Sequence, residues 1–407
     1  CGSDQAPNLR ALLSLVESKL LAPAFVAATG DLTDGAECYQ APNRPCLCGA
    51  PDGPISRQWE EYAYILADYP KTKAKFYDLP GNHDRYGSLA RAQLDWTGQS
   101  GRDGYAYLGA RGSRAPGLRA GRAGLEGQFT WEAQSPAGGS RNLFQALNTA
   151  DESGIAFGQY LQMGTINQRG PISDMPVLSS LEAADAYQNL ESFRQAPGSG
   201  LAFLLGHHPL ITEEAYPELP GLYDVQGLVG ALLQRNTAAG DSSLELQSAG
   251  GFPLAGRGWI NIGLDNWDEF SWTHRQGDTL TGCAGIDAAY PSGTVVAAFR
   301  PDRGAADLIA HAEQYQVSAY LYGHTHRPGD LAHWVQDPNG SGARVLALHT
   351  GSLWDGRFRL VAIDNHGLAT RTAQVDDWPL VLITAPVDCG LAGDNPFYAP
   401  IPLTGAD

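Results

Sequence analysis

Four short apolar segments of this chain end in the same way, on a glycine followed at once by a residue that can bind a metal. They are AFVAATGD (24–31), AKFYDLPGNH (74–83), GLAFLLGHH (200–208) and VSAYLYGHTH (317–326). Short apolar runs of this kind predict buried β-strands. Glycine at the end of a strand lets the backbone turn sharply and lets a metal or phosphate approach closely. The pattern therefore predicts a sheet that gathers polar side chains at one edge.

Segments with apolar residues at helical spacing lie between these predicted strands. They are NLRALLSLVESKLL (8–21), SRQWEEYAYILADY (56–69) and AADLIAHAEQYQ (305–316). Alternation of strand and helix predicts an α/β fold in which most strands pair in parallel. In open α/β sheets the binding site lies at the carboxyl ends of the strands. The glycine-ended segments are thus placed where a site is expected.

Two long stretches interrupt this alternation. Residues 88–200 begin with a region rich in Gly, Arg, Ala and Ser, and residues 226–300 mix glycine, aromatic residues and aspartate. Both are too long for simple connections, so we interpret them as insertions in a single domain of residues 1–407, with residues 366–407 as a C-terminal extension. These insertions either rise from the edge of the sheet that carries the site and shape a substrate pocket, or lie at the periphery of the domain. The sequence does not favour one of these alternatives over the other.

Composition excludes some classes of function. The 407 residues carry a formal net charge of −17, which argues against a nucleic-acid-binding surface, because such a surface needs a basic stripe. Apolar residues make up 43% of the chain and charged residues 17%, as in folded globular proteins. No apolar run is as long as a membrane-spanning helix requires.

The six cysteines bear on the compartment. Cys38, Cys46 and Cys48 lie in one loop-like segment, and their spacing does not match the paired knuckles of a zinc ribbon. Disulfides in an oxidising, extracytoplasmic compartment are favoured over free buried thiols, with Cys38 bridged to Cys46 or Cys48. The opening CGSDQ looks like a mature lipoprotein, whose lipidated Cys1 would attach it to a membrane; a truncated start is the alternative.

The polar segments follow one another in a recognisable order: GDLTD (30–34), GNHD (81–84), HHP (207–209) and GHTH (323–326), followed by VLALHTGSLW (345–354). In this order they resemble the motifs of the calcineurin-like metallophosphoesterases. The pattern is most similar to the branch that contains transmembrane protein 62, although membrane segments are absent from this sequence. The resemblance covers about residues 8–90, 200–215 and 303–365. It implies a two-sheet β sandwich flanked by helices.

The resemblance also implies a set of metal ligands. Asp31 would bridge two divalent or trivalent ions (Mn, Fe or Zn), since its two carboxylate oxygens can each bind one. Asn82 would add a neutral carbonyl oxygen. His207 and His324 would bind one ion and His326 the other, whereas His208, which does not match the ligand position, would lie outside the ligand set or face solvent.

The family's reaction assigns two further residues. His83 would act as proton donor to the leaving group, with Asp84 orienting it. The implied function is hydrolysis of a phosphomonoester or phosphodiester, of a small molecule or a lipid head group, by attack of a metal-bridging hydroxide.

One motif of the family is not visible. The family's first motif pairs an Asp with a His at the end of the first strand; here SDQAPNL (3–9) has Ala6 in place of the histidine. We expect that motif to lie upstream of residue 1 or to have been lost. In either case the ion held by His326 lacks a ligand within this chain. The alternative function is therefore a non-catalytic binding or structural protein on the same scaffold.

Overall fold

The computed structural model describes residues 5–18, 23–32, 62, 64–79, 81, 118–119, 128–134, 140–149, 177–211, 225–260, 268–300, 304–325, 332–337, 339–350, 353, 356–363, 368–374 and 399–401. Its labelled helices are α1 (Gln5–Glu17), α3 (Pro70–Lys73), α7 (Ser180–Gln195) and α9 (Ala305–Gln314). Its strands are β1 (Val26–Ala28), β2 (Phe76–Asp78), β3 (Leu118–Arg119), β4 (Phe129–Gln134), β5 (Arg141–Ala146), β6 (Val177–Ser179), β7 (Ser199–Leu205), β8 (Gln226–Leu232), β9 (Ser243–Glu245), β10 (Gly256–Ile260), β11 (Asp268–Trp272), β12 (His274–Gln276), β13 (Thr279–Thr281), β14 (Val295–Arg300), β15 (Val317–Tyr322), β16 (Ala332–Gln336), β17 (Arg344–His349), β18 (Arg357–Ile363), β19 (Leu368–Gln374) and β20 (Ala399–Ile401).

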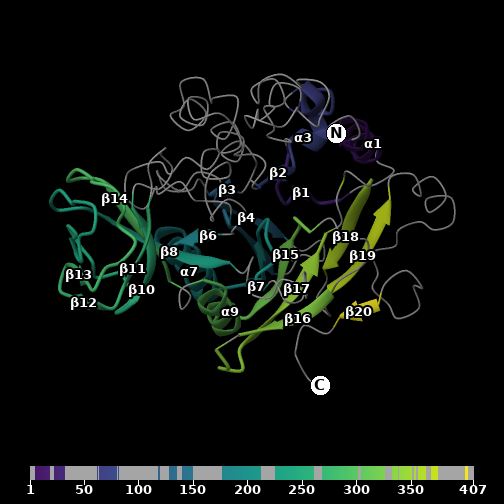
Figure 1. The fold of residues 1–407 in the computed structure, drawn as a ribbon. Helices are drawn as coiled ribbons and strands as arrows, with labels where there is room; N and C mark the ends of the chain where they lie inside the picture. Colours follow the sequence, from purple (N-terminus) through teal and green to yellow (C-terminus); the bar gives the residue numbers. More distant parts are fainter. Residues whose placement is uncertain are drawn as a thin grey trace.

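A seven-stranded sheet with the order β16-β17-β15-β7-β5-β4-β3 forms the centre of the molecule (Figure 1). The four strands β5, β7, β15 and β17 pair in parallel, and the strands outside them pair antiparallel. The predicted helix at 305–316 and the strand that follows it are confirmed as α9 and β15. The expected parallel pairing is confirmed for these central strands.

Both faces of the central strands are buried, and alternate residues serve different cores. Leu204 and Tyr320 point to the face that α7 and α9 cover. Phe203 and Ala319, their neighbours in sequence, point to the opposite face. This two-residue alternation is the geometry of a β-strand, and burying a leucine or phenylalanine side chain contributes about 1.5–3 kcal/mol. Burial on both faces explains why these strands read as continuous apolar runs.

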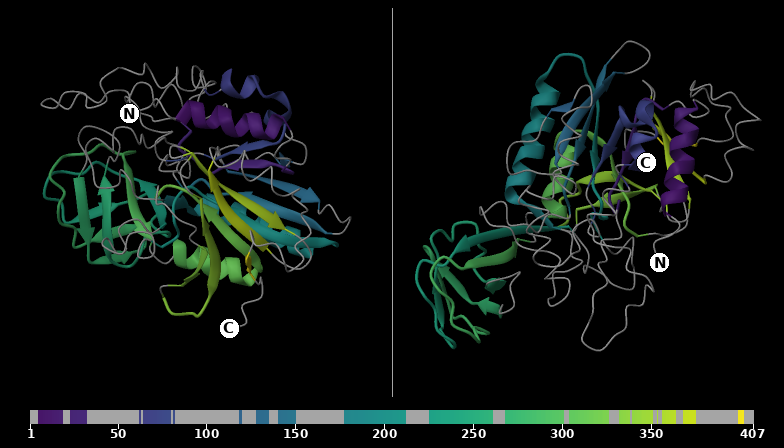
Figure 2. Two further views of the ribbon diagram at one scale, coloured as in Figure 1. Left: turned by 90° about the vertical axis from the view of Figure 1, so that its right-hand side faces the viewer. Right: turned by 90° about the horizontal axis from the view of Figure 1, so that it is seen from above.

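A second layer of strands covers that opposite face. Parallel strands β1 and β2 form one small sheet, and β18, β19 and β20 form another; side chains of both contact the same core. Helix α1 packs outside this layer, where Leu13 shares one hydrophobic cluster with Phe76 and Leu12 shares another with Phe358. In the left view of Figure 2, α1 lies on one side of the sheets and α9 on the other. The chain is thus a mixed α/β protein with several sheets and few helices.

The described residues within 226–300 form most of two further sheets at one end of the molecule (teal to green in Figures 1 and 2). Strands β8, β10, β11 and β14 form a five-stranded sheet with β6, and β9, β12 and β13 form a three-stranded sheet. A separate core, which includes Phe252, Phe270 and Trp272, lies between them. The pairing of β6 with β8 links this unit to the rest of the chain.

Two stretches interpreted as additions to the domain contribute strands to its layers. Strands β4 and β5 of the seven-stranded sheet lie within the expected insertion 88–200. Residues 368–374, within the expected C-terminal extension, form β19, which pairs with β18 along its whole length. In the first case the sequence signal is weak because the buried residues of β5 include two polar ones, Asn142 and Gln145, which interrupt the apolar run.

Among the residues that the structure describes, no helix combines the length and the apolar character needed to cross a membrane.

Candidate metal centre

Three strand ends converge on one point of the structure. Asp31 follows β1, His207 follows β7, and His324 follows β15. Backbone hydrogen bonds continue the β7–β15 pairing beyond the strands, since Gly206 N–H donates to Leu321 O (2.9 Å) and Gly323 N–H donates to His207 O (3.0 Å). The two histidines are thereby brought together from positions far apart in the chain.

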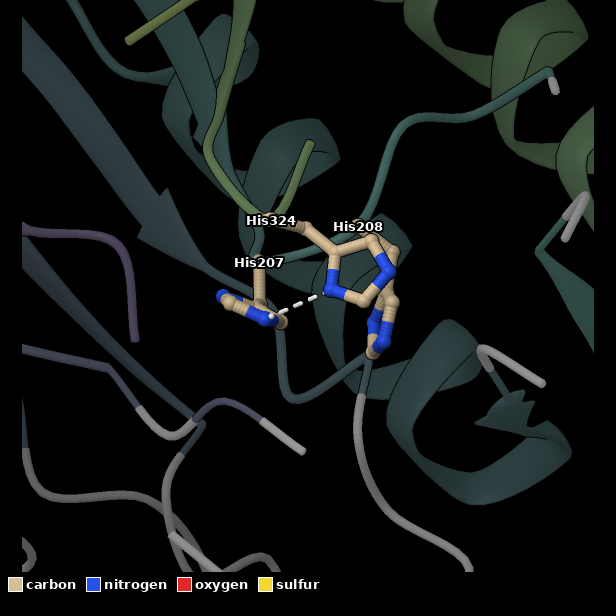
Figure 3. Close-up of side chains that lie close together, drawn as sticks. All are labelled: His207, His208 and His324. Atoms are coloured by element: carbon tan, nitrogen blue, oxygen red, sulfur yellow. Dashed lines mark hydrogen bonds between the residues drawn. The ribbon is translucent and has the colours of Figure 1, made fainter. Parts of the chain in front are cut away.

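The polar atoms of these residues are in close contact. His207 Nε2 lies 3.2 Å from Asp31 Oδ2. It lies 3.1 Å from His324 Nδ1, the contact drawn as a dashed line in Figure 3. The side chain of His207 is 2% exposed and that of Asp31 12% exposed, so water screens this contact little. The three atoms form the centre of the candidate site.

The tautomer of His207 follows from its other nitrogen. Nδ1 lies 2.7 Å from the carbonyl oxygen of Thr29, which can only accept, so Nδ1 carries a proton and donates it. In the neutral ring Nε2 then presents a lone pair toward Asp31. A lone pair and a carboxylate oxygen repel each other unless a positive charge, a proton or a metal ion, lies between them. A backbone carbonyl on the second nitrogen is also the usual arrangement of a metal-binding histidine.

The measured separations match those of ligands that share an ion. Two donors bound tetrahedrally at about 2.0–2.1 Å lie about 3.3 Å apart. The contacts of His207 Nε2 with Asp31 and with His324, at 3.2 and 3.1 Å, are close to this value. Each separation therefore suits a pair of donors on one cation, His207 with Asp31 and His207 with His324, and such nitrogen and carboxylate donors fit Zn, Mn or Fe.

The backbone at the site is held in unusual conformations. Asp31 (φ 55°) and His324 (φ 68°) both adopt the left-handed region. This region costs a non-glycine residue of the order of 1–2 kcal/mol, and such residues gather at functional sites. Beside them Gly30 has a φ of +100°, and a Cβ built there would lie 2.6 Å from His207 Nδ1. Only glycine leaves room for the imidazole at this point.

A threonine and a second histidine complete the described part of the site. Thr149 follows β5, and its Oγ1 lies 3.2 Å from the backbone nitrogens of both His207 and His208 and 3.0 Å from His208 Nδ1. One ligand atom from each of His207, His208 and His324 lies within 4.8 Å of the others. The sequence does not single out Thr149, because polar residues interrupt the strand RNLFQA before it and leave no apolar run that would mark a sheet edge.

The loop that carries His324 is held from the neighbouring strand. His349, at the end of β17, is fully buried, and its Nε2 lies 2.7 Å from Oγ1 of Thr325. Its backbone carbonyl accepts a hydrogen bond of 2.6 Å from Arg359 Nε. His349 therefore fixes the residue between His324 and His326, which is a positioning role.

The remaining residues proposed from the sequence lie outside the described residues: Asn82, His83, Asp84 and His326. Gly81, directly before Asn82, is described, and a Cβ added to it would overlap the carboxylate of Asp31. The backbone that leads into GNHD thus passes against the candidate site.

The cysteine predictions are covered only in part. Cys1, Cys38, Cys46, Cys48 and Cys389 lie outside the described residues. Cys283 is a free thiol, and burial raises its pKa to about 11.

Comparison with protein-family models and with curated proteins gave no match to this chain.

Proposed function

We propose that the chain is a metal-dependent phosphoesterase with a metallophosphoesterase-type sandwich fold. The observation that carries the proposal is the pair of contacts that His207 makes with Asp31 and with His324, all three lying just beyond the ends of parallel strands. The two layers of strands, with α7 and α9 outside one and α1 outside the other, are consistent with that fold. The motif order in the sequence supplies the reaction class.

The described residues fit a cation. Asp31 offers a carboxylate oxygen and His324 a second nitrogen, and each lies about one ligand separation from the His207 Nε2 lone pair that Thr29 orients. Asn82 and His326 would extend this set toward a second ion. When bound, divalent or trivalent ions of Mn, Fe or Zn supply charge stabilisation of a phosphoryl group and acidify water near neutral pH.

The residues of the chain have separate tasks in this proposal. The Thr29 carbonyl and Gly30 hold the ring of His207 in one orientation, so that little reorganisation is needed on binding. His83 would give a proton to the leaving-group oxygen, and Asp84 would hold the His83 ring in place. The substrate would be a phosphate ester of a small molecule or lipid head group, consistent with a chain that is too acidic to favour nucleic acid.

Metal content and turnover together test the proposal. The purified chain is expected to retain Mn, Fe or Zn and to hydrolyse chromogenic phosphomonoesters or phosphodiesters. His207→Ala should lose both properties, because it removes the nitrogen at the centre of the cluster. His274→Ala is the matched control, since His274 is exposed on β12 within the separate 226–300 unit.

The outcomes separate the two classes of function. Metal bound without turnover on either ester would favour the non-catalytic binding protein. A chain that binds none of the three metals when they are supplied during refolding would refute the proposed site.

A further inference from the structure

The adjacent residues His207 and His208 make different hydrogen bonds, which favour opposite tautomers of their rings. Thr149 Oγ1 lies 3.2 Å from two backbone N–H groups, those of His207 and His208. A hydroxyl oxygen has two lone pairs, and these two contacts use both. The hydroxyl hydrogen is then directed to the third neighbour, His208 Nδ1 at 3.0 Å. Thr149 therefore donates to Nδ1, and the neutral ring of His208 carries its own proton on Nε2.

This tautomer is the reverse of that of His207. His207 donates from Nδ1 to the Thr29 carbonyl and presents a lone pair at Nε2. His208 accepts at Nδ1 and presents an N–H at Nε2. A metal ligand must offer a lone pair; in this tautomer the lone pair of His208 lies at Nδ1, where it accepts the hydrogen of Thr149, and Nε2 carries a proton. The two residues share a sequence context but differ in what they can bind.

His208 is also fixed next to the candidate metal centre. Its ring centroid lies 4.7 Å from that of His207 and 4.5 Å from that of His324 (Figure 3). It is 1% exposed, its backbone nitrogen contacts Thr149, and its carbonyl accepts a hydrogen bond of 2.6 Å from Tyr320 Oη. His208 is thus held by its backbone nitrogen, by its backbone carbonyl and by its ring nitrogen Nδ1.

We propose that His208 binds a phosphoryl oxygen of the substrate through its Nε2–H and is not a ligand of the metal. The inference rests on the phosphoesterase function proposed above and adds a substrate-binding residue to it. A phosphoryl group on the ion between Asp31, His207 and His324 would expose acceptor oxygens beside this ring. A neutral donor held in place binds such an oxygen without adding a further positive charge.

Binding of inorganic phosphate to the zinc-loaded chain measures this role without turnover. His208→Ala is expected to keep the zinc stoichiometry and affinity of the wild type and to weaken phosphate binding on the order of ten- to a hundredfold, as measured by calorimetry. His208→Gln is the matched variant, because its side-chain amide restores an N–H donor near the position of Nε2. It is expected to recover most of the affinity for phosphate.

Two results would overturn the proposed role of His208, and a third would overturn the phosphoesterase function. Loss of zinc in both variants identifies His208 as a metal ligand and removes the inference. Unchanged phosphate affinity in His208→Ala removes it as well. A wild-type chain that binds zinc but no phosphate contradicts the phosphoesterase function itself.

The wild-type chain provides a test that does not depend on the variants folding. Nitrogen NMR of labelled histidine distinguishes a protonated ring nitrogen from one with a lone pair. We expect His208 Nδ1 to be unprotonated and Nε2 to keep its proton when zinc is added, with a shift of that proton's signal on adding phosphate. A protonated Nδ1, or loss of the Nε2 proton on adding zinc, would contradict the proposal.

Discussion

Replacing Gly30 by alanine tests how closely the backbone must approach the candidate metal centre. Gly30 has a φ of +100°, and a Cβ built there would lie 2.6 Å from His207 Nδ1 and 2.7 Å from the backbone of Gly81. Both distances are far inside van der Waals contact. The new methyl group must therefore displace the imidazole of His207, and with it the hydrogen bond of 2.7 Å from Nδ1 to the Thr29 carbonyl.

The expected loss of stability has two sources. A non-glycine residue at such a φ costs about 1–3 kcal/mol, and the hydrogen bond from His207 is worth about 1 kcal/mol. We expect Gly30→Ala to destabilise the chain by about 2–4 kcal/mol in urea unfolding. Zinc affinity should fall by about 10- to 100-fold, the range for losing a residue that orients a ligand.

Gly198→Ala is the control that separates the cost of a positive φ from the cost of the steric clash expected for Gly30→Ala. Gly198 also has a positive φ, +75°, but no atom lies within 4 Å of a Cβ built there. This control should cost roughly 1–2 kcal/mol, the strain of the left-handed region alone, and leave zinc affinity at the wild-type value. If Gly30→Ala bound zinc as tightly as Gly198→Ala, the reasoning that Gly30 positions His207 would be refuted.

Three further predictions concern other parts of the chain. His83→Ala is expected to keep its metals and lose about 10²- to 10⁴-fold in turnover, the range for a general acid; release of the metals would contradict that role. Burial opposes ionisation of Asp337, but hydrogen bonds from Ser341 and Asn339 outweigh it and lower its pKa. Asp337→Asn should therefore lower the free energy of unfolding in urea by about 1 kcal/mol at pH 7. This difference between the variant and the wild type should vanish as the pH falls through the lowered pKa of Asp337. A difference in unfolding free energy that stays the same at all pH values would contradict the assigned role of the ionised Asp337. Cys283, with a pKa raised to about 11, should react with iodoacetamide at pH 8 roughly a hundredfold more slowly in the native chain than after denaturation, followed by peptide mass spectrometry.

Helices and strands could be predicted from the sequence where the apolar residues follow one clear pattern, either helical spacing or a continuous run. Helix α9 has apolar residues at helical spacing, and β7 and β15 are apolar runs ended by glycine, so both their type and their polar ends were evident. That His207 and His324 would lie at one edge followed from parallel pairing alone.

The contacts that tune the site could not be predicted in the same way. The hydrogen bonds of Thr149 to His207 and His208 join β5 to β7, and nothing in the segment RNLFQALNT marks it as a neighbour of those residues. The tautomer of His208 depends on that contact, so it is a property of the sheet order and not of the HHP motif. Long-range pairing of this kind has no local signal.

The three residues of the candidate centre come from different layers, and this has a consequence for how the protein is made. Asp31 extends from the layer of β1 and β2, whereas His207 and His324 extend from the seven-stranded sheet. A ribosome would release most of the sequence before the last of the three emerged, and the donors meet only after the layers dock. A cation held there would bind the docked layers and not the nascent chain, so its binding energy would stabilise the contact between layers. Metal loading would then be the closing step of maturation.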